Sequence, residues 1–197
     1  MQVLLRLLLA LLLATGMPAA LLAAEATPEA PILPGHSFIL AAAPSLIDRY
    51  FYHTVVAVTA HGDTGYIGVI LNQPETVTLA QIFPDYQSTG KQVLFNGGPD
   101  YPNQFFYIVR GTEAITGAAP FSDSAALAFN LGALQDLLAG KRNHAGLRVM
   151  HGVASWFPGQ LENEIKRGGW RVLPYDEAIL FDRDPENLWQ QLQGTDL

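Results

Sequence analysis

Two segments with strand-like sequences, separated by a short loop, restrict the fold of this chain more than any other feature. Residues 54–60 are rich in valine, and residues 66–71 are rich in β-branched and aromatic residues. The loop between them, His61–Gly65, contains two glycines, which tolerate the backbone conformations of tight hairpin turns. We therefore predict an antiparallel hairpin here, and with it a sheet that begins with strands adjacent in the sequence.

Other elements follow from apolar runs bounded by glycine, proline or capping residues. Further strands are predicted at residues 37–42, 92–95, 104–110, 147–154, 170–173 and 178–181. Helical structure is predicted at residues 78–83, from the cap Asn130 to Gly140, at residues 159–167, and from Asp184 to Gly194 with Pro185 at the first position. Strands dominate the first half and do not alternate regularly with helices, so the α+β class is favoured over a doubly wound sheet.

The N-terminus has the form of a signal peptide. Arg6 precedes Leu7–Leu13, a run that is almost pure leucine. Gly16 and Pro18 interrupt the apolar stretch. Ala24-Glu25-Ala26 then places small residues at both positions that a signal peptidase reads. We predict cleavage after Ala26, with cleavage after Ala24 as the alternative.

This leader sets the expected domain organisation and location. Residues 1–26 are assigned to the signal peptide, the proline- and alanine-rich residues 27–34 to an extended linker, and residues 35–193 to a single domain. The processed protein is expected to be periplasmic or secreted, without stable membrane insertion. The alternative is an uncleaved N-terminal membrane anchor, because residues 7–24 reach the lower limit of a bilayer-spanning length.

Composition excludes several kinds of chemistry. The chain contains no cysteine, so disulfides and thiolate catalysis are impossible. Loss of Arg6 and Glu25 with the leader leaves 10 basic and 17 acidic residues, and the net charge stays at −7. Since no basic stripe is present, we do not expect nucleic acid as a partner. The expected partner is therefore an unidentified small ligand or another protein.

One candidate ligand-binding site is the turn Asn96-Gly97-Gly98-Pro99. Consecutive backbone amides in such a turn can form a nest that binds a carboxylate or phosphate. The simpler interpretation is a tight turn built from two glycines and a proline. Neither a lysine nor a following serine or threonine completes a phosphate-binding loop.

A second candidate is the segment that begins at Gly159 and opens a predicted helix. The free amides of the helix and the side chain of Gln160 could orient a ligand near Trp156. The alternative places Trp156 and Leu161 in the core, but packing alone does not explain the polar Gln160 and Glu162. We therefore select Gln160 and Glu162 as candidate ligand-binding residues.

Metal and nucleophilic sites are poorly supported by the sequence. The five histidines include no HExxH motif and no closely spaced pair, so no metal site is predicted. Ser155 is the one serine in a glycine-containing segment near a histidine, His151, but its spacing does not match a nucleophile elbow. A hydrolase using His151, Ser155 and Glu162 is retained as an alternative.

Several motifs together resemble the YqgE/AlgH family, a bacterial family without an established activity. The matching segments, in order, are Thr54-Val55-Val56, Gly68–Asn72 with Pro74, Asn96–Pro99, Gly152 with Trp156, Gly159–Glu162, Trp170 and Leu180-Phe181. The resemblance implies an α+β fold with a mixed, largely antiparallel sheet bent into a pseudo-barrel and several peripheral helices. It implies no established cofactor, and none is expected here.

The resemblance also shapes the expected site and function. Asn72 joins Asn96, Gly97, Gly98, Gln160 and Glu162 as a candidate ligand-binding residue. Gln73 stands where the family usually has a basic residue, and Asp100 where an aliphatic residue is usual, so this region is less positive and suited less to an anion. We expect an exported, non-enzymatic binding or accessory protein. The alternatives are a hydrolase acting on an envelope substrate and a transcription-related regulator, which would have to stay in the cytoplasm.

Overall fold

The computed structural model describes residues 36–84, 86, 92–111, 115–142 and 145–194. The predicted signal peptide and the linker at residues 27–34 lie outside the described residues. No helix in the described part of the chain has both the length and the apolar character needed to span a bilayer.

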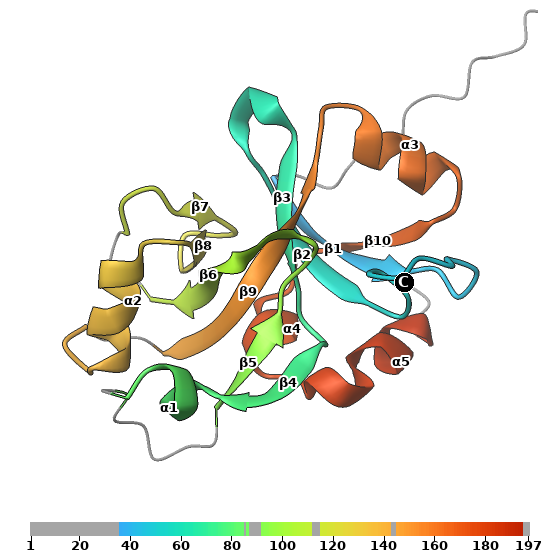
Figure 1. Ribbon diagram of the computed structural model, residues 1–197. Coiled ribbons are helices and arrows are strands. Elements are labelled where there is room, and N and C mark those ends of the chain that lie inside the picture. The colour runs from blue at the N-terminus through green and yellow to red at the C-terminus, as the bar shows by residue number, and fades with distance from the viewer. Residues whose placement is uncertain (1–35, 85, 87–91, 112–114, 143–144, 195–197) are drawn as a thin grey trace, which may run out of the picture.

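Strands form one curled sheet that is mostly antiparallel (Figure 1). The strands are β1 (Ser37–Ala42), β2 (Val55–Ala60), β3 (Tyr66–Ile70), β4 (Pro74–Thr78), β5 (Val93–Asn96), β6 (Asp100–Arg110), β7 (Ala119–Pro120), β8 (Ala125–Ala128), β9 (Gly146–Trp156) and β10 (Trp170–Pro174). The main path runs β10-β1-β2-β3-β9-β6-β8-β7, and β5 joins β4 to β9. Because β5 pairs with β9 in parallel, the sheet is mixed. It curls into a half-barrel, which confirms the predicted fold class.

The predicted hairpin is confirmed and forms the centre of this sheet. β2 and β3 pair antiparallel, and the loop between them contains a short 3-10 helix (Gly62–Thr64). Across neighbouring strands, Phe38 pairs with Val58, Val58 with Gly68, and Gly68 with Ala154. Gly68 lacks a side chain where an added Cβ would lie 2.7 Å from the Ala57 carbonyl oxygen. The glycine therefore lets the hairpin strands pack closely.

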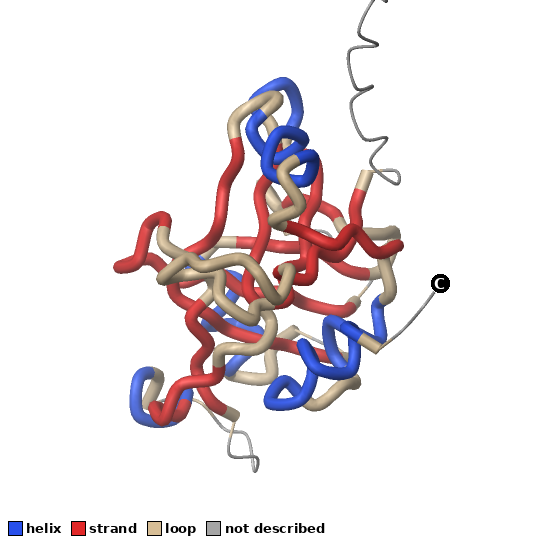
Figure 2. The backbone as a smooth tube through the Cα atoms, turned by 90° about the vertical axis from the view of Figure 1, so that its right-hand side faces the viewer, coloured by secondary structure: helices blue, strands red, loops and turns tan. Residues whose placement is uncertain are grey.

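Most of the helices lie around the sheet, as Figure 2 shows, whereas the helix at residues 177–181 lies inside the half-barrel. The helices are α1 (Leu79–Ile82), α2 (Leu131–Leu138), α3 (Gln160–Lys166), α4 (Glu177–Phe181) and α5 (Leu188–Gln193), with a 3-10 turn (Pro185–Asn187) before α5. Asn130 caps α2, as predicted, because its Oδ1 accepts the Ala133 amide at 2.9 Å. Asp184 is a cap as predicted, with its Oδ1 accepting the Glu186 amide at 3.1 Å, but it caps the 3-10 turn, and α5 begins only at Leu188.

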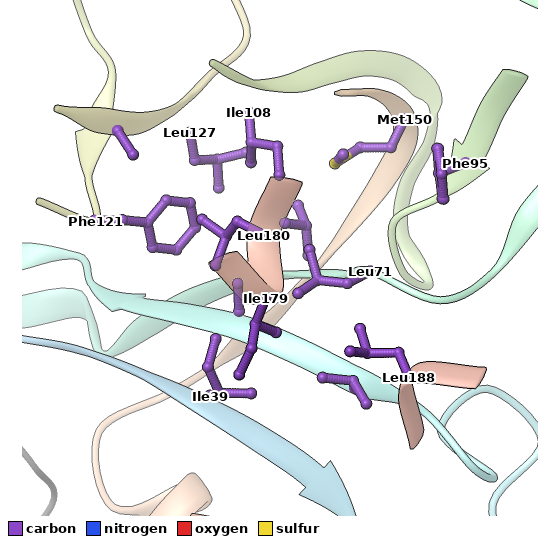
Figure 3. Close-up of a cluster of buried hydrophobic side chains, with 14 of the residues drawn as sticks. Ile39, Leu71, Phe95, Ile108, Phe121, Leu127, Met150, Ile179, Leu180 and Leu188 are labelled. Carbon is purple, nitrogen blue, oxygen red and sulfur yellow. The ribbon is translucent and has the colours of Figure 1, made fainter. Parts of the chain in front are cut away.

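The hydrophobic core has separate clusters on the two faces of the sheet, because β1 is covered on both sides. Ile39 and Ala41 point into one cluster, and Phe38 and Leu40 into another. In Figure 3, Leu180 of α4 lies among side chains from the sheet and fills the inside of the half-barrel. Burial of this face is the main stabilising term of the fold.

One predicted strand is wrong. Residues 178–181 are expected to be a strand but belong to α4, which begins after Asp176. The Asp176 Oδ1 accepts the Ala178 amide at 2.9 Å and caps the helix. A four-residue apolar run has the same appearance in a buried strand and in one turn of a buried helix. The capping aspartate decides the conformation.

The sequence analysis also missed β4, β7 and β8. In β4, Pro74 is expected to end the preceding strand, yet the chain continues and pairs with β5. β8 is alanine-rich, and alanine has a low strand propensity. It forms because β6 offers an antiparallel edge from Tyr107 to Arg110. β4 and β8 thus both depend on partner strands that are distant in the sequence.

Candidate functional site

The glycines of the Asn96–Pro99 turn allow two segments of backbone to cross. A Cβ added at Gly97 would lie 2.3 Å from the Gly152 carbonyl oxygen, and one added at Gly152 would lie 2.2 Å from the Gly98 carbonyl oxygen. The Gly97 amide donates to His151 O at 2.8 Å, and the Gly98 amide donates to Asn96 Oδ1 at 3.1 Å. Both amides are thus engaged by protein acceptors, which favours the structural interpretation of the turn. Anion binding here stays a prediction.

Asn72 bridges the end of β3 and the start of β2. Its Oδ1 accepts the Val55 amide at 2.8 Å, and its Nδ2 donates to His53 O at 2.9 Å. His53 has a left-handed backbone with φ of 54°, an uncommon conformation for a residue with a side chain. The side-chain amide of Asn72 holds this conformation, so its visible role is to organise the loop before β2.

The residues of the hydrolase alternative have different partners. His151 Nε2 lies 2.7 Å from Glu75 Oε1, whereas Ser155 Oγ donates to Asp100 Oδ2 at 2.5 Å. His151 and Ser155 therefore each pair with a different acid and do not form a nucleophile with its base. This arrangement does not support a serine nucleophile activated by His151.

The helix α3 carries the most organised polar cluster of the predicted sites. Glu164 Oε2 accepts the indole N–H groups of Trp156 at 3.0 Å and Trp170 at 2.9 Å. Its Oε1 accepts Gln160 Nε2 at 3.0 Å, and Gln160 Oε1 accepts the Phe157 amide at 3.2 Å. The predicted Gln160 thus lies in the cluster. Trp156 and Leu161 are buried in the core, as the alternative interpretation proposes, and Trp170 is buried with them.

Glu164 is the residue that the sequence analysis missed. It lies four residues after Gln160 on the same helix, which is the spacing at which helical side chains meet. That spacing alone could have indicated that Glu164 and Gln160 meet. The two indole donors come from β9 and β10, however, so only the tertiary structure shows that Glu164 is the acid that accepts them.

Glu162 faces a different environment from Glu164. Its Oε2 is buried and has no hydrogen-bond partner among the described residues. The pKa of Tyr66 is raised, mainly by burial and also by the nearby Glu162 carboxylate. An unpartnered carboxylate oxygen is costly to bury, so Glu162 stays a candidate for contact with a ligand or water.

A hollow of about 490 Å³ opens beside this cluster. One wall is the loop before β2, and the other is α3 with the turn that leads to β10. The lining residues are Ser45, Leu46, Ile47, Asp48, Phe51, Gln160, Glu164, Arg167, Gly168, Gly169 and Trp170. It combines apolar and aromatic walls with a few polar groups, the usual character of a small-molecule site.

A larger hollow of about 650 Å³ lies between α1 and α2. It is mostly apolar, and its charged groups Asp136 and Lys141 pair with each other at 3.5 Å. None of the predicted site residues lines it. The smaller hollow beside α3 is therefore the better candidate, because it contains Gln160 and the polar cluster of Glu164.

A charged network around α4 has a structural role. Arg110 pairs with Glu177 at 2.7 Å and with Asp182 at 2.8 Å, which ties α4 to β6. The Arg110 hydrogen bond lowers the pKa of the Asp182 carboxyl below its usual value. Among the residues described, no group of three histidine, cysteine or acidic side chains is placed to hold a metal ion.

The half-barrel fold is shared with solved structures. One is protein DIP2367 from Corynebacterium diphtheriae, with a TM-score of 0.66, 24% sequence identity, and coverage of 82% of this chain and 86% of that chain. Another is AlgH from Pseudomonas aeruginosa, with a TM-score of 0.68, 24% identity, and coverage of 84% and 93%. These similarities establish the fold.

The family is established by sequence. The AlgH-like family model DUF179 matches residues 39–195, and the chain belongs to this family. A UPF0301 protein of Thioalkalivibrio sulfidiphilus is 31% identical over 159 residues, which cover 77% of this chain and 83% of the relative. A UPF0301 protein of a Psychrobacter species is also 31% identical, over 79% of this chain and 86% of the relative. The predicted resemblance is confirmed.

Proposed function

We propose that this protein is an exported, non-enzymatic binding or accessory protein that takes a small ligand in the hollow beside α3. The observation that carries the proposal is the Glu164 cluster. One carboxylate fixes Gln160 and the indole of Trp170, both of which line the hollow. Side chains held in this way present a prearranged surface, which lowers the entropy cost of binding.

The chemistry of the walls defines the class of ligand. Leu46, Phe51 and Trp170 offer an apolar and aromatic surface, while Gln160 and Arg167 offer polar contacts. Two carboxylates, Asp48 and Glu164, also line the hollow, against the guanidinium of Arg167. The ligand that fits best therefore has an apolar ring or chain and a hydrogen-bonding group. The hydrolase alternative is disfavoured because Ser155 and His151 are paired with separate acids.

Ligand binding is tested by a thermal-shift screen of the purified protein against envelope metabolites that carry an apolar part and a hydrogen-bonding group. A ligand that prefers the native state raises the melting temperature. Ser45→Trp should fill the exposed mouth of the hollow and abolish the shift, whereas Asp123→Trp, in the exposed turn between β7 and β8, should leave it unchanged. A shift that survives Ser45→Trp would place the ligand elsewhere.

Export is tested separately, by fractionating cells and measuring the mass of the N-terminus. A form that begins at Glu25 or Thr27, outside the cytoplasm, is the expected result. An intact Met1 in the cytosolic fraction would contradict export and would favour the regulatory alternative.

A further inference from the structure

The loop at residues 45–52, which we call the docking loop, exposes apolar and aromatic side chains in a cluster. Ile47 is 96% exposed, Tyr52 55% and Tyr50 40%. Single exposed apolar residues are ordinary on a protein surface, but a group of them on one projecting loop is a mark of an interaction surface.

The docking loop is firmly held, so the exposure of Ile47 does not result from a loosely packed segment. Asp48 Oδ1 accepts the amides of Tyr50 at 2.7 Å and Phe51 at 3.0 Å, and the Tyr52 amide donates to Asp48 O at 3.1 Å. The ring of Phe51 packs against Trp156 and Trp170, with centroids 6.1 Å and 5.4 Å away. The inner side of the loop is part of the core, and its outer side presents Ile47 to the surroundings.

Positive charge surrounds this apolar tip in a chain whose net charge is −7. The Arg49 guanidinium lies over the Tyr50 ring, 4.7 Å from its centroid. Arg167 lines the same hollow as Ile47, and its neighbour Lys166 is exposed. Among the described residues, no carboxylate forms an ion pair with any of these cations.

The acids nearest to the docking loop do not cancel this charge by direct pairing. Asp48 uses one oxygen to accept two backbone amides of the loop, and Glu164 accepts two indoles and Gln160. At physiological salt the Debye length is about 8 Å, so acidic residues on distant elements are largely screened from this face. Asp48 and Glu164 keep their negative charges, but both side chains are half-buried, whereas Arg49, Lys166 and Arg167 are exposed. The charged groups that this face presents most fully to the surroundings are therefore cations.

We propose that the docking loop binds the surface of an anionic phospholipid bilayer. Ile47 enters the boundary between head groups and acyl chains, Tyr50 and Tyr52 lie at the level of the head groups, and the cations face lipid phosphates. Tyrosine is favoured at this interface, and apolar insertion combined with cationic attraction is how peripheral proteins bind anionic membranes. This inference goes beyond the proposed ligand site and does not depend on it.

A lipid surface fits the docking loop better than a protein partner does. A stable protein interface buries about 800 Å² on each partner. One aliphatic side chain and two half-exposed tyrosines, surrounded by cations, do not provide such an area. They are sufficient for reversible attachment to a membrane, where apolar insertion and charge attraction act together.

The test is sedimentation of the purified protein with vesicles, comparing phosphatidylcholine alone with a mixture containing about 30% phosphatidylglycerol, a composition that creates the negative surface potential required. Wild type and variants carry the same N-terminus, so any contribution of the leader is constant. We expect wild type to bind the anionic vesicles at least tenfold more tightly than the neutral ones. Each cation that faces the lipid phosphates should contribute about fivefold to this ratio.

Two variants separate the apolar and the electrostatic contributions. Ile47→Ser should lower partitioning to anionic vesicles about tenfold, because the inserted side chain is lost. The double variant Lys166→Glu and Arg167→Glu should lower it at least tenfold on anionic vesicles, with little change on neutral ones. All these side chains are exposed, so circular dichroism and urea midpoints should match those of wild type.

Matched controls lie elsewhere on the surface. Leu131 of α2 is 50% exposed, and Lys141 is exposed just after the same helix. Leu131→Ser and Lys141→Glu should leave binding unchanged. Wild-type protein that fails to bind anionic vesicles, or loss that is equal for control and docking-loop variants, would overturn the proposal.

Discussion

Glu164 is expected to stabilise the fold as well as the candidate site, and its replacement tests the reasoning directly. Its carboxylate accepts the indole N–H groups of Trp156 and Trp170, and both tryptophans are buried. Glu164→Ala removes the acceptor and leaves both donors without a partner in the core. Each unsatisfied buried donor costs about 1–3 kcal/mol, so the pair sets a range of about 2–6 kcal/mol.

The partial exposure of Glu164 reduces this cost, since water can reach part of the space left by the side chain. We therefore expect Glu164→Ala to lower the free energy of unfolding by about 3 kcal/mol, within the ~5–15 kcal/mol that keeps a domain folded. Glu164→Gln keeps a carbonyl oxygen that can accept both indoles, and Gln160 can rotate its amide to match. Loss of the charge should then cost only about 1 kcal/mol.

The assay is urea unfolding followed by tryptophan fluorescence and circular dichroism, with the slope m compared between variants to confirm that the same surface is exposed. Glu186→Ala is the matched control, because Glu186 is exposed and should change the stability by less than about 0.5 kcal/mol. Equal losses for Glu164→Ala and Glu164→Gln, or a loss below about 1 kcal/mol for Glu164→Ala, would refute the argument that this oxygen satisfies two buried donors.

Three further predictions follow from the described contacts. Gly152→Ala should lower soluble yield and the urea midpoint severely, because its Cβ would lie 2.2 Å from a carbonyl oxygen, while Gly62→Ala, in open space at a φ of 58°, should cost only about 1–2 kcal/mol. The pKa of Asp182 is lower in the folded state than in the unfolded state because of Arg110. Its contribution to stability is therefore present above the unfolded pKa and is lost as the pH falls through the folded pKa. The urea midpoint of Asp182→Asn should accordingly fall less in acid than that of wild type. Asn72→Ala leaves one backbone amide and one carbonyl without partners and should lower the unfolding free energy by about 1–3 kcal/mol, and an unchanged urea midpoint would contradict the bridging role.

The parts of the fold that were predicted from the sequence depend on local signals. The hairpin at residues 54–71 was predicted because its strands are adjacent and its loop contains glycine. The α2 helix was predicted because Asn130 caps it through an amide three residues away. In both cases the residues that decide the conformation lie within a few positions of one another.

The errors have the opposite origin. Residues 178–181 were assigned to a strand because a short apolar run does not reveal its period, and β8 was missed because alanine gives no strand signal. The missed strand exists because β6 pairs with it. His151 and Ser155 are possible partners on the sequence alone, because Glu75 and Asp100, which pair with them in the fold, lie 76 and 55 residues away along the chain.

The amino-acid sequence by itself determined the α+β class, the family and the position of Gln160 at the start of a helix. It also predicts the signal peptide. Only the tertiary structure decided which groups meet. It placed Glu164 between two indoles, closed the glycine turn against β9, and set the docking loop beside the end of α3. The physical reason is that capping and turn formation act over a few residues, whereas side-chain pairing depends on how the sheet curls.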